Sequence, residues 1–215
     1  MKKLAITVTA AFLLIANTVN AEIGIGVTAN FASIDTSGSE TLRDSGKVTT
    51  ASRSQDEVLP ELFIEARGDR GAFGLAYIPV QELGSGTRAD SNNSPGGDTG
   101  QYTATAEVKK HMMLYTDINL TEFSGQNLFV TGGISSATIS TGETLNGGSA
   151  YQDVSVLGYT IGAGVTGDMP FTANSYYKLA YTYTDYDGYE DSNSNNKIKA
   201  DTEVDSIKAS IGYKF

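Results

Sequence analysis

After its first 21 residues, the chain repeats a pattern in which apolar and polar positions alternate. Alternate side chains of a β-strand point to opposite faces, so a period of two indicates strands that have one apolar face. Clusters of turn-forming residues separate the alternating segments. The pattern predicts eight strands, at 23–34, 58–67, 72–83, 102–118, 128–139, 154–165, 176–186 and 202–215.

The connections between these strands alternate in length. Four are long and rich in Ser, Gly, Asn and Asp (35–57, 84–101, 140–153 and 187–201), and three are shorter (68–71, 119–127 and 166–175). An even number of strands with long loops at one end and short turns at the other is typical of an up-and-down barrel.

The short connection at 68–71 allows one register to be predicted. If these four residues form a tight turn, apolar residues of the two strands meet on one face. The expected pairs are Ala66–Phe73, Ile64–Leu75, Leu62–Tyr77 and Pro60–Pro79.

Alternation alone fits a soluble β-sandwich, which hides its apolar face in a core, and a membrane barrel, which turns that face to lipid. The polar face favours the barrel, because it has charges of both signs within the strands. An eight-stranded barrel has an interior just wide enough to be filled by side chains. We therefore predict a charge network in the lumen, formed by Glu61, Glu65, Arg67, Glu107, Lys109, His111, Lys178 and Lys208.

Lys110 departs from this pattern, because its parity places it on the lipid face. A lysine at the bilayer midplane costs roughly 2–4 kcal/mol. Two arrangements avoid this cost: a position at the outer rim, from which the side chain reaches lipopolysaccharide phosphates, or a bulge that turns it inward. Counting along the strand from Ile118 favours the rim.

The first 21 residues have the features of a secretory signal. Residues 1–3 are basic, 4–16 are apolar, and 19–21 form a small-residue site before Glu22. The apolar run is shorter than the roughly 20 residues of a membrane-spanning helix. We therefore predict a signal peptide at 1–21 and one barrel domain at 22–215.

The last strand places Ile207, Ala209, Ile211, Tyr213 and Phe215 on one face. This ending resembles the C-terminal insertion signal of Gram-negative outer-membrane proteins, which typically ends in an aromatic residue. Together with the predicted signal and eight strands, it makes the mature chain resemble the small outer-membrane barrels of the OmpA-like, OmpX-like and opacity-type group.

The resemblance implies an all-β fold, an eight-stranded antiparallel up-and-down transmembrane β-barrel with short periplasmic turns and four longer extracellular loops. It places the protein in the cell outer membrane. The expected partners are outer-membrane lipids and lipopolysaccharide, with periplasmic chaperones and the barrel-assembly machinery during biogenesis. We expect a monomer.

Composition excludes several other classes. A net charge of −10 disfavours nucleic acid as a partner, because phosphate binding needs a basic face. The absence of cysteine excludes a disulfide framework, a thiolate zinc site and a cysteine nucleophile. An acidic run at 185–191 offers carboxylates to Ca²⁺ but lacks the EF-hand spacing, so a solvated loop is the favoured interpretation. No cofactor or metal is expected.

His111 is the only histidine. It is either a catalytic base, as in the lipid-modifying barrels of this membrane, or a hydrogen-bonded residue of the lumen, which the absence of a neighbouring serine favours. The expected function is therefore a non-enzymatic structural or surface role with a filled lumen. The alternatives are a narrow porin-like channel and, less favoured, a lipid-modifying enzyme.

Overall fold

The computed structural model describes residues 21–42, 46–90, 100–143, 152–170, 172–192 and 196–215. These ranges contain nine strands: β1 (Glu22–Leu42), β2 (Val48–Gly68), β3 (Gly71–Ile78), β4 (Gln81–Asp90), β5 (Gly100–Phe123), β6 (Gln126–Glu143), β7 (Val154–Asp168), β8 (Ser175–Ser192) and β9 (Asn196–Lys214). The signal predicted at 1–21 lies, except for its last residue, outside the described residues. None of the described residues belongs to a helix that is long and apolar enough to span a membrane.

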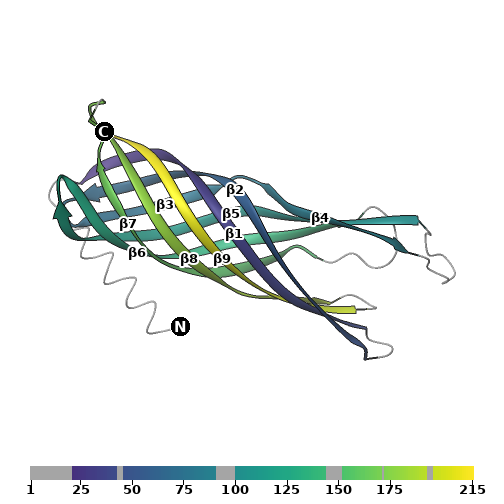
Figure 1. Ribbon diagram of the computed structural model, residues 1–215. Helices are drawn as coiled ribbons and strands as arrows, with labels where there is room; N and C mark the ends of the chain where they lie inside the picture. Colours follow the sequence, from purple (N-terminus) through teal and green to yellow (C-terminus); the bar gives the residue numbers. More distant parts are fainter. Residues whose placement is uncertain (1–20, 43–45, 91–99, 144–151, 171, 193–195) are drawn as a thin grey trace.

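The nine strands form one closed antiparallel ring (Figure 1). Neighbours pair in the order β3-β2-β1-β9-β8-β7-β6-β5-β4, and β3 also pairs with β5, which closes the ring. The predicted all-β, up-and-down antiparallel barrel is confirmed. β3 pairs with β2 on one side and with β5 on the other, so the ring is closed in its short-turn half, whereas no ladder joins β2 to β4 among the described residues.

The predicted third strand is divided in two. β3 ends at Ile78 opposite His111, and β4 begins at Gln81 opposite Val108, so both parts follow one register along β5. Pro79 lies in the gap. Proline has no backbone N–H to donate to a ladder, so the pairing is interrupted there. Eight barrel positions are therefore occupied by nine strands.

The hairpin of β2 and β3 has the predicted register. Leu62 pairs with Tyr77, Ile64 with Leu75, and Ala66 with Phe73. The β2–β3 ladder ends at the first of these pairs, so Pro60 and Pro79 are not joined as predicted.

The long connections at 35–57 and 187–201 are mostly strand rather than loop. The ladder of β1 and β2 continues to Thr41 and Val48, although 35–57 was expected to be a loop. Beyond the lipid both faces of a strand meet water, so the sequence there does not alternate, yet its backbone groups still pair. Figure 1 shows the extended hairpins projecting from the barrel at the end opposite the short turns.

An apolar belt surrounds the outside of the barrel. On β1 it consists of Ile23, Ile25, Val27 and Phe31, all exposed. The belt on β9 runs from Ile207 to Phe215. Each stretch covers nine residues, and a tilted strand needs about 9–11 to cross a bilayer.

Candidate functional site

Glu65 lies at the centre of the barrel interior near the short turns. Its side chain is fully buried, and its carboxylate accepts four hydrogen bonds. The donors are Arg67 Nη1 at 2.5 Å, Tyr115 OH at 2.6 Å, Tyr176 OH at 2.7 Å and Lys178 Nζ at 3.1 Å. A carboxylate has about four lone-pair sites, so this charge is fully satisfied.

Lys178 connects Glu65 to a second carboxylate. Its Nζ lies 2.5 Å from Asp117 Oδ2, and its side chain is 11% exposed. Two acids and two bases, Glu65, Asp117, Arg67 and Lys178, therefore form a neutral buried group, which we call the central network. Buried ions persist only when they are paired and hydrogen-bonded.

Large aromatic rings fill the space around the central network. Tyr176 lies below the Arg67 guanidinium, whose Cζ is 3.8 Å from the ring centroid. A Cβ atom at Gly212 would overlap the Tyr176 ring, and one at Gly74 would overlap the Tyr115 ring. The glycines of the inner face therefore provide the volume that these rings occupy.

A second ion pair lies apart from the central network. Lys208 Nζ is 2.8 Å from Glu61 Oε2, and both side chains are largely buried. Glu61, Glu65, Arg67, Lys178 and Lys208 of the predicted lumen set thus all lie inside the barrel.

Glu107 and Lys109 do not lie inside, so their prediction as lumen residues is wrong. The β5–β6 register shifts by one residue between Lys109 and Met112. Val108 therefore faces the interior, and its neighbours face outward. Glu107 and Lys109 pair with each other at 3.2 Å, and their side chains are 40% and 35% exposed.

The bulge that causes this shift contains Lys110, whose φ is +52°. Of the two arrangements considered for Lys110, the bulge is present, but the side chain is exposed rather than turned inward. Lys109 and Lys110 both lie on the hairpin side of Met112, which is an exposed residue of the apolar belt.

His111 lies inside and is 7% exposed. Its Nε2 is 2.8 Å from Tyr186 OH, and its Nδ1 has no partner among the described residues. The hydrogen-bond partner is therefore a tyrosine rather than the serine and acid of a triad.

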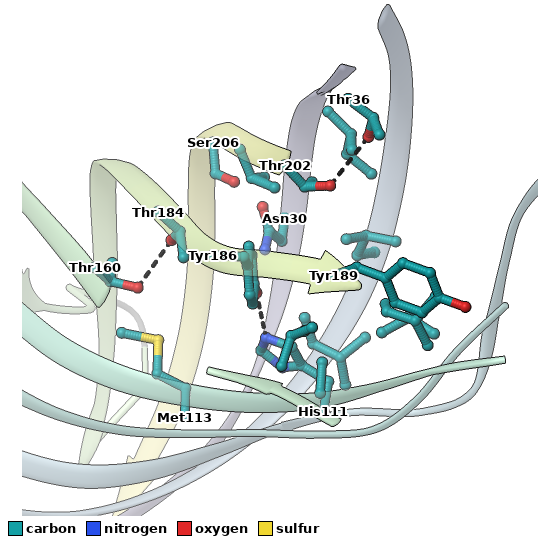
Figure 2. A pocket seen from close by; sticks show the side chains of 18 of the residues that line it. Asn30, Thr36, His111, Met113, Thr160, Thr184, Tyr186, Tyr189, Thr202 and Ser206 are labelled. Carbon is teal, nitrogen blue, oxygen red and sulfur yellow. Dashed lines mark hydrogen bonds between the residues drawn. The ribbon is translucent and has the colours of Figure 1, made fainter. Parts of the chain in front are cut away.

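A cavity of about 370 Å³ lies above the second ion pair, toward the extended hairpins. Figure 2 shows His111, Met113, Tyr186 and Asn30 among its lining residues. A second void, between this cavity and the central network, measures only about 40 Å³. The lumen is therefore hollow in its outer part and filled near the short turns.

The residues of the predicted insertion signal form one outward row on β9. Ile207, Ile211, Tyr213 and Phe215 are exposed, and Ala209 is half-buried. The Tyr213 and Phe215 rings meet edge to face with centroids 5.0 Å apart. The backbone N–H of Phe215 donates to the Ile23 carbonyl at 2.9 Å, so the last residue still belongs to the ring.

The acidic run at 185–191 is strand rather than loop, and its carboxylates diverge. Asp191 accepts the backbone N–H of Gln152, whereas Glu190 pairs with Lys197 and Lys199. Within the part of the chain that the structure describes, no three acidic, histidine or cysteine side chains converge as a metal site would require.

Glu190 lies outside the membrane and responds to pH. Hydrogen bonds from Lys197 and Lys199 lower the pKa of Glu190 to about 2 from an ordinary 4.5. A carboxyl group whose pKa is lower in the folded hairpin than in the unfolded chain stabilises the hairpin above the unfolded-state pKa. This stabilisation is lost as the pH falls through the folded-state pKa. We expect the protection factors of the amides at 197–199, which correct for the intrinsic pH dependence of exchange, to fall between pH 4.5 and about 2. Glu190→Gln should remove this fall, and equal profiles for both proteins would contradict it.

The predicted site residues did not include Asp117 of the central network, nor Tyr115 and Tyr176, which donate to Glu65. Their parity already placed them on the inner face, because each lies an even number of positions from a predicted lumen residue on the same strand. What the sequence could not provide was the pairing across the barrel, since Tyr176 and Glu65 are 111 residues apart.

The barrel has an apolar belt outside and ion pairs inside. These are the properties of a protein that crosses a bilayer with strands. The chain is a transmembrane β-barrel.

No protein-family model and no curated protein matches this barrel. It is similar to solved structures, including that of Neisserial surface protein A, at 14% identity over 88% of this chain and 99% of that one, with a TM-score of 0.44. The outer membrane protease OmpT from Escherichia coli is similar at 11% identity, 93% and 99% coverage, and a TM-score of 0.46. The outer membrane protein AlkL has 11% identity, 93% coverage of both chains, and a TM-score of 0.46.

Proposed function

We propose that this chain is a non-enzymatic protein of the Gram-negative outer membrane. Its barrel is closed to solutes, and its extended hairpins form an acidic, polar surface outside the cell. The observation behind this proposal is the central network. Because Glu65, Asp117, Arg67 and Lys178 are buried and mutually paired, no free charge and little free volume is left for a passing solute.

Opening such a lumen is energetically costly. A solute that crossed would have to separate Lys178 from both of its carboxylates, and breaking a buried pair by loss of one partner costs roughly 3–5 kcal/mol. The aromatic rings of Tyr115 and Tyr176 would also have to move, although neighbouring glycines enclose them closely. A structural or surface role is consistent with this rigid interior.

The cell outer membrane is the proposed location, with export directed by the signal at 1–21. The apolar belt supports insertion in a bilayer, and the pair Lys109–Lys110 supports lipopolysaccharide as a neighbour. Both lysines lie at the belt's hairpin-side edge, where ammonium groups meet lipid phosphates. Periplasmic chaperones and the barrel-assembly machinery are the proposed partners in biogenesis, and the inserted protein is proposed to be a monomer.

The surroundings of His111 support a role without catalysis. Its Nε2 is occupied by Tyr186, and no serine or carboxylate bonds to its ring among the described residues. A general base needs its proton donor within hydrogen-bond reach. An enzyme would predict altered lipid A acylation in cells that make the protein, abolished by His111→Ala.

Planar-bilayer recording tests the closed lumen. We expect the folded protein to insert without steady conductance, because the central network fills the barrel at its short-turn end. Insertion is verified on the same sample by its gel mobility with and without boiling. Steady conductance that changes in Glu65→Gln or Lys208→Met would contradict the proposal and identify a narrow channel.

A further inference from the structure

The outer half of the lumen differs from the inner half in its chemistry. Its 370 Å³ cavity is within the range of small-molecule sites, about 300–1,000 Å³. Apolar side chains from seven strands form most of its wall, among them Ile34, Leu59, Ile78, Val108, Val156 and Val204. A solvent-filled vestibule would not need such a wall, because water prefers polar groups.

Two β-bulges add residues to this apolar wall. The bulge at Lys110 turns Val108 into the lumen and Glu107 and Lys109 out of it. A second register shift lies between Tyr186 and Tyr189 of β8, and both tyrosines line the cavity. Val108 and these rings belong to one apolar cluster. Bulges re-aim side chains near functional sites. Here both interrupt the alternation of faces, and the side chains next to them that point into the lumen are Val108 and the two tyrosines.

Two buried polar atoms in the cavity wall have no partner. Asn30 is 4% exposed and His111 is 7% exposed, and neither Asn30 Oδ1 nor His111 Nδ1 has a hydrogen bond in the described structure. Other polar groups of the wall bond to each other: Thr160 to Thr184 at 2.8 Å and Thr36 to Thr202 at 3.2 Å (Figure 2). A buried unpaired acceptor costs about 1–3 kcal/mol, so a ligand that donates to Asn30 gains affinity.

The charges around the cavity favour a neutral occupant. Lys208 at the inner end is neutralised by Glu61 at 2.8 Å. Arg53 and Asp187 have opposite signs and lie among the outer lining residues. The inner end leads to the small void and the central network, so the open path from the cavity runs toward the hairpin end.

We propose that this cavity binds a small neutral amphipathic molecule taken from outside the cell. It has an apolar body that fills the space between the two bulges and a hydroxyl group that donates to Asn30 Oδ1. The cavity is a binding site rather than a conduit, because the barrel is closed beneath it.

Two adjacent methionines allow a direct test. Met113 lines the cavity and is 5% exposed, whereas Met112 is 46% exposed on the lipid side. The protein, labelled with ¹³C at its methionine methyl groups, is folded into lipid nanodiscs and titrated with 1-naphthol. We expect the Met113 signal to shift and saturate. The Met112 signal follows only the partition of naphthol into lipid and does not saturate.

The polar contact is tested with naphthalene and with Asn30→Leu. Loss of one hydrogen bond costs about 1–1.5 kcal/mol, so naphthalene should bind roughly tenfold more weakly than 1-naphthol. Asn30→Leu should abolish this preference and leave the affinity for naphthalene unchanged. Ala137→Phe, at a buried position of the wall, should abolish saturable binding of both compounds.

Three results would overturn the proposal. Parallel, non-saturating shifts of Met112 and Met113 would mean that the cavity takes no ligand. Equal affinities for the two compounds would refute the amphipathic class, and a hydroxyl preference that persists in Asn30→Leu would refute Asn30 as the acceptor. Saturable binding that survives Ala137→Phe would place the site elsewhere. Each variant is scored only on protein that passes the gel-mobility test of folding.

Discussion

Replacing Lys178 with methionine should lower the free energy of unfolding by roughly 3–5 kcal/mol. The side chain lies between Glu65 and Asp117, with its Nζ 3.1 Å and 2.5 Å from their carboxylate oxygens. Methionine keeps most of the volume but removes the positive charge, so Asp117 would lose its base and Arg67 alone would have to neutralise two buried carboxylates. Urea unfolding of the protein in lipid vesicles, followed by tyrosine fluorescence, measures the change.

Lys199→Met is the matched control. Lys199 also pairs with a glutamate, Glu190, at 2.9 Å, but both side chains are about half exposed. Exposed pairs contribute little to stability, so this variant should unfold almost like the original protein. A Lys178→Met protein as stable as the control would show that the central network does not hold the barrel together.

Deletion of Phe215 should sharply reduce the amount of protein in the outer membrane and leave export to the periplasm intact. Phe215 is 74% exposed, so its loss removes little packing from the folded barrel. Its side chain instead completes the outward row that ends β9, which we propose the assembly machinery recognises. Cell fractionation with immunoblotting measures the membrane and periplasmic pools.

Phe215→Tyr serves as the control, because it keeps an aromatic final residue. It should restore most of the membrane pool. An unchanged membrane pool after deletion would refute the insertion-signal hypothesis. A refolding experiment in detergent separates assembly from stability, since the truncated chain should still form a heat-modifiable barrel in vitro.

The sequence predicted the part of the fold that the membrane constrains. Where one face meets lipid, apolar residues must alternate, so the register of Leu62 with Tyr77 followed from the pattern and one tight turn. The same parity placed Glu65 and Lys178 inside. Beyond the lipid the constraint disappears, and the strands that continue to Leu42 or Asp90 resemble loops in composition.

The two misplaced lumen residues have one local origin. Alternation predicts faces only while the register is continuous, and the bulge at Lys110 breaks it. No single-strand pattern shows this break, because it depends on how β5 pairs with β6. Glu107 and Lys109 were therefore placed inside, and Val108 was placed outside.

The bulge and Pro79 lie at the same height of the barrel wall. Pairing of β3 and β4 with β5 skips Pro79 and Val80, which lie opposite Lys109 and Lys110, and pairing of β5 with β6 skips Lys110 and His111. Hydrogen bonds are thus missing on both flanks of one short stretch of β5. The β2–β3 ladder stops at the same height, at Leu62–Tyr77, and no ladder joins β2 to β4 beyond it among the described residues. If the cylinder is pulled open sideways, it should therefore part first between β2 and β4, starting at the level where membrane gives way to water.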